Sequence, residues 1–285
     1  MQHIPQIFDR KRVRLHRGRA GSDFAGHDFL FREAAERLSE RLDDVARDFP
    51  LVLDLGAKTG FFHGHPKIGA LVESEFSTLQ SSATIRVIAD EENLPFAPEI
   101  FDLVMSSLSL HWVNDLPGAL IQIRQCLKPD GLFLAQFFGG QTLKELRDAL
   151  ATAALEIEGG LTPHISPFID VRDAGSLLGR AGFSLPVVDS ETVTVSYEHA
   201  FALMKDLRGM GESNALAQMR KNFSLRRLFT RAAEIYQERF AGADGRIPAT
   251  FELVTLTAWA PHETQQKPAK RGSGKVNLKD FLKDG

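Results

Sequence analysis

The chain has 285 residues, of which 43% are hydrophobic, and its formal net charge is -3. This length and composition allow one sizeable buried core, which predicts a single domain with insertions rather than two full domains. The near-neutral balance gives no general attraction to nucleic acid or to an anionic membrane, so we expect no nucleic-acid partner.

The first element is a basic start, MQHIPQIFDRKRVRLHRGR. It lacks the apolar centre of a signal peptide, and no run in the chain approaches the ~20 apolar residues that span a bilayer. Its arginines resemble those of a mitochondrial transit peptide, but Asp9 argues against that reading. Residues 10–19 suit either a solvated, partly helical flank or a docking face for an acidic protein or RNA.

Residues 28–48 follow as an amphipathic helix, because one helical face carries only Leu30, Ala34, Leu38, Leu42, Val45 and Phe49. Short apolar runs come next, at 51–56, 68–73, 84–90, 101–107 and 131–137. Runs of this kind suit strands that are buried on both faces of a parallel sheet.

The second half continues the alternation of helix and strand. Between the runs at 101–107 and 131–137, helical spacing occurs at Leu116, Leu120, Ile123 and Leu127. After 137 come a helix at 142–158, a strand at 191–197, a helical block at about 199–240 and a strand at 250–260. This order predicts a doubly wound α/β sheet with a helical insertion before the last strand. We expect one domain over 1–261, with residues 1–50 as its helical flank, and a disordered basic tail over 262–285.

Only one cysteine, Cys126, is present, so an intramolecular disulfide and a Cys-based zinc site are excluded. A reducing compartment is favoured, and we expect a soluble, cytoplasmic protein that reaches a membrane only through a partner.

The first strand leads into a glycine turn, LVLDLGAKTGFFHGHP. Asp54 and Gly56 stand at the carboxyl end of the strand, where ligands bind in such sheets, and Gly60 follows. Glycines let the backbone approach a ligand closely, and N–H groups at a helix start bind anions. Lys58 occupies the middle glycine position of a D-x-G-x-G-x-G pattern, so it either narrows the crevice or points outwards. The alternative is a tight strand-to-helix connection without a ligand.

Acidic residues follow the next strands in the same way, with Glu75 after the second strand and Asp90 and Glu91 after the third. The fourth strand delivers FDLVMSSLSLHWV, and LKPDGLFLA precedes the fifth. In this order and spacing, residues 51–137 resemble class I S-adenosylmethionine-dependent methyltransferases. The resemblance implies a Rossmann-like, mostly parallel sheet of seven strands and S-adenosylmethionine as cofactor.

By that resemblance each residue of the set has a role. Gly56 and Gly60 approach the methionine end, Glu75 binds the ribose, and Asp90 meets the adenine amino group. Ser107 and Leu108 line the adenosyl crevice, and the cofactor set is completed by Asp54 and Glu91. The alternative for each acid is a helix N-cap or a solvated loop charge.

A narrower resemblance rests on LPFAPEIFDLVMSSLSLHWVNDLPGAL, GGQTLKELRDAL, GGLTPHISPF and MKDLRGMGESNAL, together with IFDRKRVRLHRGRA at the start. From Ile7 to Pro261 the chain is similar to the methyltransferase-fold assembly factors of respiratory complex I and their alphaproteobacterial relatives. It resembles more distantly the malonyl-carrier-protein methyltransferase of biotin synthesis.

The narrower resemblance implies modification of a protein, with a complex I subunit as the partner. In the mitochondrial branch the modified residue is an arginine, and the reaction is described as hydroxylation rather than methylation. Two alternatives stay open: a small-acid O-methyltransferase of the biotin-pathway type, and a non-catalytic assembly chaperone that retains the fold.

No catalytic triad is evident, and methyl transfer can proceed by positioning alone. Candidates for the acceptor side are His111 and Trp112 after the fourth strand, and His164 between two prolines. A capping histidine, a core tryptophan and a structural loop histidine are the alternatives. His63 and His65 lack a carboxylate nearby in the sequence, so we predict no metal site.

Overall fold

The computed structural model contains one sheet of seven strands in the order β3-β2-β1-β4-β5-β7-β6. The strands are β1 (Phe49–Leu55), β2 (Ile68–Glu75), β3 (Ile85–Ile88), β4 (Phe101–Ser107), β5 (Leu127–Phe138), β6 (Ser184–Tyr197) and β7 (Ile247–Trp259). Strands β1 to β5 pair in parallel, whereas β7 is antiparallel to both of its neighbours, β5 and β6. The predicted doubly wound, mostly parallel sheet is confirmed.

The structure describes residues 6–21, 23–58, 60–77, 85–160, 165–218, 226–266 and 272–273. Across these ranges no helix is long and apolar enough to cross a membrane. His164 and most of the predicted tail lie outside the described residues.

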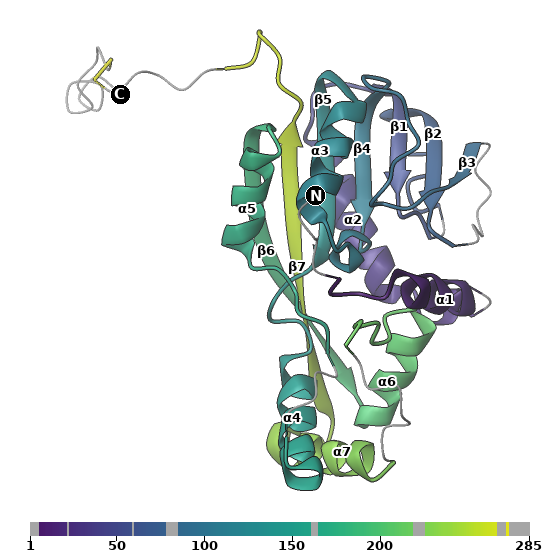
Figure 1. Ribbon diagram of the computed structural model, residues 1–285, viewed down its shortest axis with the longest axis vertical. Helices are drawn as coiled ribbons and strands as arrows, with labels where there is room; N and C mark the ends of the chain where they lie inside the picture. Colours follow the sequence, from purple (N-terminus) through teal and green to yellow (C-terminus); the bar gives the residue numbers. More distant parts are fainter. Residues whose placement is uncertain are drawn as a thin grey trace.

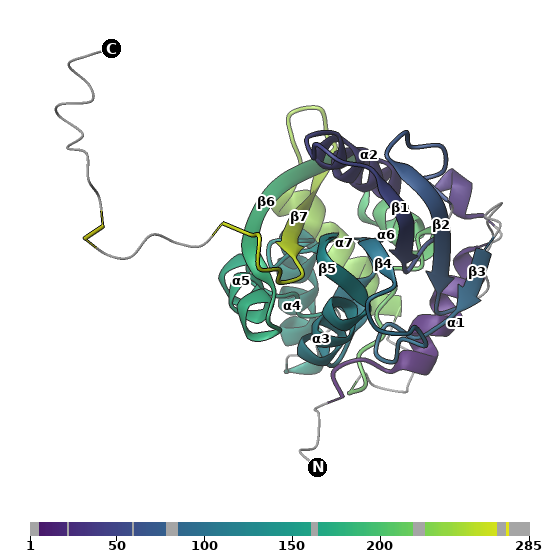
Figure 2. The ribbon, with the colours of Figure 1, turned by 90° about the horizontal axis from the view of Figure 1, so that it is seen from above.

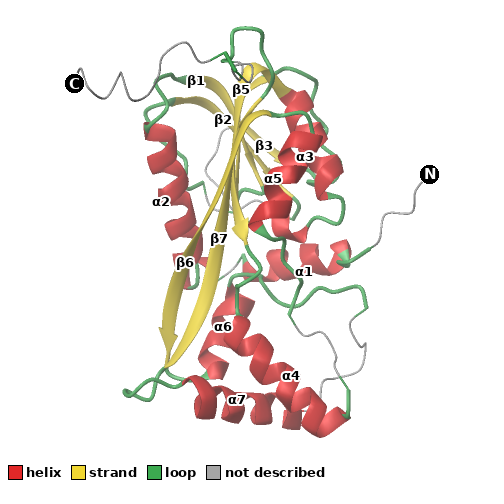
Figure 3. Cartoon of the chain, turned by 90° about the vertical axis from the view of Figure 1, so that its left-hand side faces the viewer, coloured by secondary structure: helices red, strands yellow, loops and turns green. Residues whose placement is uncertain are grey.

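Helices cover both faces of the sheet and form a second layer of structure beyond one end (Figures 1 and 2). They are α1 (Arg10–Ala20), α2 (Phe29–Asp43), α3 (Leu116–Cys126), α4 (Lys144–Glu158), α5 (Val171–Arg180), α6 (Ala200–Gly209) and α7 (Arg226–Phe240), with short 3-10 helices η1 (Phe24–Gly26) and η2 (Leu110–Trp112). Figure 3 shows α2 on one face of the sheet and α3 and α5 on the other. We call α4, α6 and α7 the helical lobe.

The amphipathic pattern of α2 explains its place. Its fully buried Leu38 and Leu42 pack with Phe49 and Val52 of β1, while its charged side chains face away from this cluster. The helix ends at Asp43, earlier than residue 48 as predicted.

No helix follows β1 in the described residues, and here the expectation of a strand-to-helix turn is wrong. The chain passes from Gly56 to β2 through turns, with Gly60 and Gly64 at φ 67° and 77°. Positive φ is the left-handed region that an α-helix does not use, and Pro66 then removes a further N–H donor. The face that a crossover helix would cover is covered instead by α2, which precedes β1 in the chain.

The last two strands extend past the rest of the sheet. β6 pairs with β7 from Ser184 opposite Trp259 to Tyr197 opposite Ile247, whereas β5 pairs with β7 only as far as Leu253. Figure 3 shows the helical lobe around this extension. α6 and α7 lie between β6 and β7 in the chain, so the predicted helical insertion before the last strand is confirmed.

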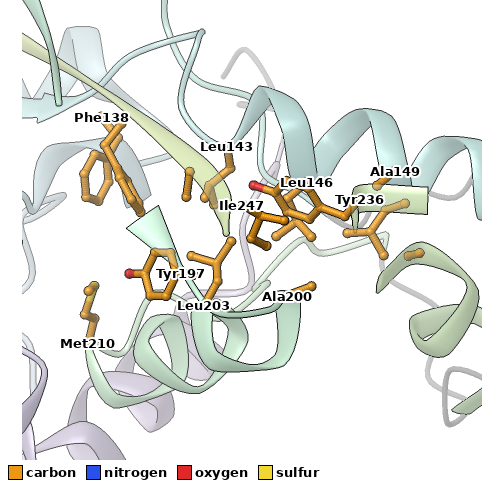
Figure 4. Packing of buried hydrophobic residues seen from close by; sticks show 14 of the residues in the cluster. Phe138, Leu143, Leu146, Ala149, Tyr197, Ala200, Leu203, Met210, Tyr236 and Ile247 are labelled. Carbon is orange, nitrogen blue, oxygen red and sulfur yellow. The ribbon is translucent and has the colours of Figure 1, made fainter. Parts of the chain in front are cut away.

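Figure 4 shows buried apolar side chains in the core of the helical lobe, among them Leu146, Ala149 and Tyr236. Leu146 and Ala149 of α4 belong to one buried cluster with Tyr236 of α7 and Ile247 of β7. The Tyr236 hydroxyl donates a hydrogen bond to the carbonyl oxygen of Pro248 at 2.7 Å. The lobe is therefore fixed to the same strand that completes the sheet.

Candidate functional site

Carboxylates gather where β1 and β2 end. Asp54 pairs with Glu73 in the parallel register, and Glu75 lies two residues further along the same face of β2. All three side chains are buried. Burial, and then the negative charges of Glu73 and Glu75, raise the pKa of Asp54 well above its usual value. Glu73 was missed from the sequence, although its place in the alternating V-E-S-E pattern indicates that it shares a face with Glu75.

The glycine turn lies very close to neighbouring side chains, and at Gly56 a β-carbon would not fit. At Gly56, where φ is 78°, an added Cβ would lie 2.1 Å from the Ser109 Oγ. At Gly60 it would lie 3.0 Å from Glu73 Oε1. Close contact thus requires glycine at position 56 and leaves little room at position 60, while the positive φ of both residues favours glycine.

Lys58, between these glycines, points inwards. Its ammonium lies 3.1 Å from Glu212 Oε1 and donates a hydrogen bond to the carbonyl oxygen of Met210 at 3.1 Å. The Phe31 ring centroid is 3.9 Å from the same nitrogen. Burial lowers the pKa of Lys58, and the Glu212 carboxylate opposes that shift. The lysine therefore ties the glycine turn to the segment after α6 instead of extending into solvent.

Two arginines of α1 meet the predicted cofactor acids. Arg17 Nη1 lies 2.6 Å from Glu91 Oε1 and 3.5 Å from Glu75 Oε1. Arg10 forms ion pairs with Asp90 and Glu91. The solvated flank expected for residues 10–19 is wrong for these two side chains, since Arg17 is buried and the Arg10 side chain is only 13% exposed.

The spacing of residues in the sequence could have indicated this contact between α1 and the acids. Arg10, Val13, Arg17 and Ala20 recur at intervals of three and four residues, which places them on one face of α1. Figure 1 shows α1 lying across the lower end of the sheet, between the strands and α6. Its basic face thus covers the acids at the carboxyl ends of the strands.

Ion pairing overcomes burial at Glu91. Burial alone would raise its pKa, but the guanidinium groups of Arg17 and Arg10 lower it to about 2. The same pairing raises the pKa of Arg17, against the effect of burial. This part of the crevice therefore carries fixed, opposite charges at neutral pH.

On the other side of the glycine turn, His111 and Trp112 of η2 are both buried. His111 Nε2 lies 2.9 Å from Glu212 Oε2, and Trp112 Nε1 donates a hydrogen bond to the same oxygen at 2.8 Å. The His111 ring centroid is 5.0 Å from that of Phe138 and 6.0 Å from that of Phe168. Glu212 is a further residue that the sequence analysis missed.

A cavity of about 590 Å³ adjoins this aromatic group. Phe168 is part of its wall and contacts the His111 ring. The wall combines the N-terminal segment, the end of β5, α4, the loop before α5 and the segment after α6: Gln6, Ile7, Gly140, Arg147, Ile165, Ser166, Pro167, Phe168, Leu216 and Gln218. Among the described residues, the cavity thus reaches His111 only through the Phe168 ring.

Comparison with known proteins identifies the family. Residues 53–135 match the model of the methyltransferase domain. A Danio rerio protein named "Arginine-hydroxylase NDUFAF5, mitochondrial" is 47% identical to the chain over 292 residues, which cover 98% of this chain and 90% of that protein. The chain belongs to the NDUFAF5 family of methyltransferase-domain proteins.

Two further matches show how the chain relates to other methyltransferases. A malonyl-[acyl-carrier protein] O-methyltransferase of Xylella fastidiosa is 33% identical over 270 residues, covering 90% of this chain and 89% of that enzyme. The phosphoethanolamine N-methyltransferase 2 of Haemonchus contortus, solved with S-adenosyl-L-methionine, matches with a TM-score of 0.50 at 12% identity, over 85% of this chain and 57% of that one. The last match establishes the shared fold alone. Both resemblances predicted from the sequence, to class I methyltransferases and to the complex I assembly factors, are confirmed.

Buried polar atoms without a partner indicate where a family cofactor fits. Glu75 Oε1 accepts hydrogen bonds from the N–H and hydroxyl of Ser77, but Glu75 Oε2 has no partner. Ser107 Oγ and Glu73 Oε2 are also buried without partners. Such atoms are costly in a folded protein unless a ligand or water satisfies them. The acid predicted to bind ribose thus has an unused acceptor, which fits a sugar hydroxyl.

The remaining predicted cofactor residues surround the same crevice. Leu108, at φ 47°, is fully buried and its N–H donates to the carbonyl oxygen of Gln136 at 2.8 Å. Asp90 Oδ1 accepts from the backbone N–H of Glu92 at 3.0 Å, besides its pair with Arg10. The cofactor roles of these residues stay predictions.

The two histidines after the glycine turn diverge. His63 Nε2 lies 2.9 Å from Glu73 Oε1, so the sequence-based statement that no carboxylate is near holds only along the chain. His65 Nε2 lies 3.4 Å from Asp43. In the described ranges no group of three or more His, Cys, Asp or Glu residues is arranged to hold a metal ion.

Proposed function

We propose that this member of the NDUFAF5 family binds S-adenosylmethionine at the carboxyl ends of β1 to β4. The supporting observation is Glu75, whose unpartnered carboxylate oxygen is buried beside the glycine turn, where it suits a ribose hydroxyl. Gly56 and Gly60 allow the methionine end to approach the backbone. Asp90 is assigned to the adenine amino group, and Asp54, Glu91, Ser107 and Leu108 to the walls of the crevice.

When bound, this cofactor supplies a methyl group on a positively charged sulfur. The residues of the chain hold it and exclude water, because α1 closes the crevice from one side. The acceptor enters from the cavity beside His111 and Trp112, which carry the acceptor-side role predicted for them. His164, which lies outside the described residues, keeps the same assignment from the sequence.

We assign the acceptor to a protein side chain. Relatives that are 45–47% identical to the chain carry the name arginine-hydroxylase, which supports an arginine as the modified residue and, with the resemblance to complex I assembly factors, a complex I subunit as the partner. The cytoplasm is the proposed location, with membrane contact made through that partner.

A carboxylate acceptor is the second candidate, and one observation favours it. Arg147 is part of the cavity wall, whereas none of the residues named there is acidic. Two Arg147 nitrogens donate to the carbonyl oxygens of Gly140 and Thr142, which fixes the guanidinium without neutralising its charge. A small acid on a carrier protein, the kind of acceptor that the O-methyltransferase relatives are named for, would find a counter-charge there.

Cofactor binding is tested first by calorimetry and thermal unfolding. A ligand that binds only the folded state raises the melting temperature with its concentration. We expect this with S-adenosylmethionine and S-adenosylhomocysteine, and we expect Glu75→Gln to weaken binding by roughly 1–3 kcal/mol, since it loses a charged hydrogen-bond acceptor. Glu36→Gln, on the exposed face of α2, is the control. Absence of heat and of a melting shift at millimolar ligand would reject the cofactor.

The acceptor is tested by mass spectrometry. Complex I subunits from a deletion strain, and a malonylated carrier protein, are each incubated with the purified chain and cofactor. A mass gain of a methyl group or of one oxygen on a subunit supports the protein acceptor, whereas methylation of the carrier supports the second candidate. Tight binding of a subunit without any mass change would indicate an assembly chaperone.

A further inference from the structure

His111 presents one nitrogen that the protein leaves unused. The side chain is only 1% exposed, and Nε2 is held by Glu212 at 2.9 Å. Nδ1 is buried and has no hydrogen-bond partner. A buried imidazole nitrogen of this kind is costly unless a bound group completes it.

The negative charge on Glu212 determines which ring nitrogen of His111 carries the proton. Its two oxygens accept from the Lys58 ammonium, the His111 ring and the Trp112 indole. Burial would raise the pKa of Glu212, but the Lys58 ammonium and the hydrogen bond from the His111 ring lower it to about 2. An ionised carboxylate only accepts hydrogen bonds, so the proton of the facing histidine nitrogen must lie on Nε2.

The ring itself is neutral at pH 7. Burial lowers the pKa of His111, and the positive charges of Arg17 and Lys58 act in the same direction, while Glu212 opposes them. The other rings around it belong to Trp112, Phe138 and Phe168 and carry no charge. With Nε2 protonated, Nδ1 therefore presents a lone pair.

We propose that Glu212 is a positioning residue that orients His111, and that His111 Nδ1 accepts the N–H or O–H proton of the acceptor group. This rests on the proposed function. In methyl transfer the acceptor atom forms a bond to the methyl carbon, and the sulfur–carbon bond breaks with its electron pair remaining on sulfur. The acceptor proton passes to Nδ1, and the imidazolium so formed is stabilised by Glu212.

The same contacts explain why a lysine stands at position 58 of the glycine turn. The same carboxylate that fixes His111 anchors the lysine of the glycine turn, so one residue joins the cofactor side of the crevice to the acceptor side. The departure from a three-glycine turn is thus part of the positioning system.

A spectroscopic test needs no acceptor. The ¹⁵N shifts of His111 in the full-length chain report the protonation of each ring nitrogen, and His111→Gln assigns the signal. We expect a neutral ring with a proton on Nε2 in the wild type, and a mixture of tautomers in Glu212→Gln. Glu145→Gln, which removes another buried carboxylate in the lobe, is the matched control and should leave the signal unchanged. A wild-type ring protonated on Nδ1, or an unchanged signal in Glu212→Gln, would overturn the proposal.

Activity gives the second readout, with whichever acceptor the mass experiment identifies. We expect Glu212→Gln to lower kcat by roughly 10- to 100-fold. Because Glu212 raises the pKa of His111, its loss should move the acidic limb of the kcat profile to lower pH, and Glu212→Asp should restore part of the rate. Unchanged kcat and an unchanged limb would contradict a positioning role. If the wild type binds no S-adenosylmethionine, the proposed function fails while the tautomer result still decides the role of Glu212.

Discussion

Arg17 balances the charges of the crevice, because it is the buried cation that contacts Glu75 and Glu91 together. Its replacement by alanine leaves both carboxylates with less compensation in a buried setting. Breaking a buried ion pair in this way costs about 3–5 kcal/mol. We therefore expect Arg17→Ala to lower the free energy of unfolding by an amount in that range, measured by urea denaturation.

The matched control is Arg19→Ala, on the same helix but exposed. Its substitution should leave the urea midpoint nearly unchanged. Equal stability of the Arg17 and Arg19 variants would contradict this role of Arg17.

The site residues that could be predicted from the sequence differ from those that were missed in how far away along the chain their partners lie. Glu75, Asp90 and Glu91 were predictable, because each directly follows an apolar strand and the carboxyl ends of parallel strands share one edge. The contact between Arg17 and Glu91 joins residues 74 apart, and that between His111 and Glu212 joins residues 101 apart. No local period encodes such contacts; they depend on how α1 and the segment after α6 pack on the sheet.

At the scale of elements, the strand positions were predicted well. A continuous apolar run indicates a buried strand whichever helix or turn connects it to the next strand. The missing helix between β1 and β2 was not foreseen. The glycine pattern indicated a helix start, but glycines in the left-handed region and Pro66 prevent one, and α2 takes over the exposed face. The start of β6 was also missed, since its first residues, from Ser184, alternate little and are mostly half-buried or exposed.

Among the described residues after β7, Gln265 makes a side-chain contact with the core. The Gln265 side-chain amide donates hydrogen bonds to Asp130 Oδ1 and to the carbonyl oxygen of Ala260, each at 2.8 Å. Residues 267–285 are rich in lysine and glycine and contain little apolar surface to offset ordering entropy. A chain ending at residue 266 should therefore melt at the wild-type temperature.

A chain ending at residue 261 loses both hydrogen bonds of Gln265. A pair of partly exposed bonds is worth about 1 kcal/mol, which lowers the melting temperature of a chain of this size by roughly 2–4 °C. Calorimetry of the two truncated chains beside the full chain checks this. A large loss of stability in the longer truncation would show that residues after 266 pack on the core.

Over the whole molecule, buried carboxylates set the response to acid. The pKa values of Glu91 and Glu212 are lowered to about 2 by their cationic partners, against burial. Because folded-state values below the unfolded ones add stability above the unfolded pKa, this stability is lost as the pH falls from about 4.5 to about 2. Each group contributes on the order of 3 kcal/mol.

Two other groups also change how the free energy of unfolding depends on pH. His111, with its lowered pKa, favours unfolding as the pH falls below 6.5, whereas Asp54, with its raised pKa, has the opposite sign. Urea unfolding between pH 7 and pH 3 should show the steepest decline below pH 4.5. A decline of the same size in the double variant Glu91→Gln, Glu212→Gln would assign the acid sensitivity to other groups.

The place of β7 in the sheet has a consequence for synthesis on the ribosome. β7 lies between β5 and β6, yet it is the last strand of the sheet to be made. Until Trp259 has emerged, β5 is an open edge of the nascent sheet and β6 has no partner, so the growing chain exposes the hydrogen-bonding groups that promote aggregation. The helical lobe also cannot complete its core before β7 is made, because Ile247 and Phe251 of β7 are part of that core. Closure of the sheet and assembly of the lobe are thus one late event, and a premature stop anywhere before β7 prevents both.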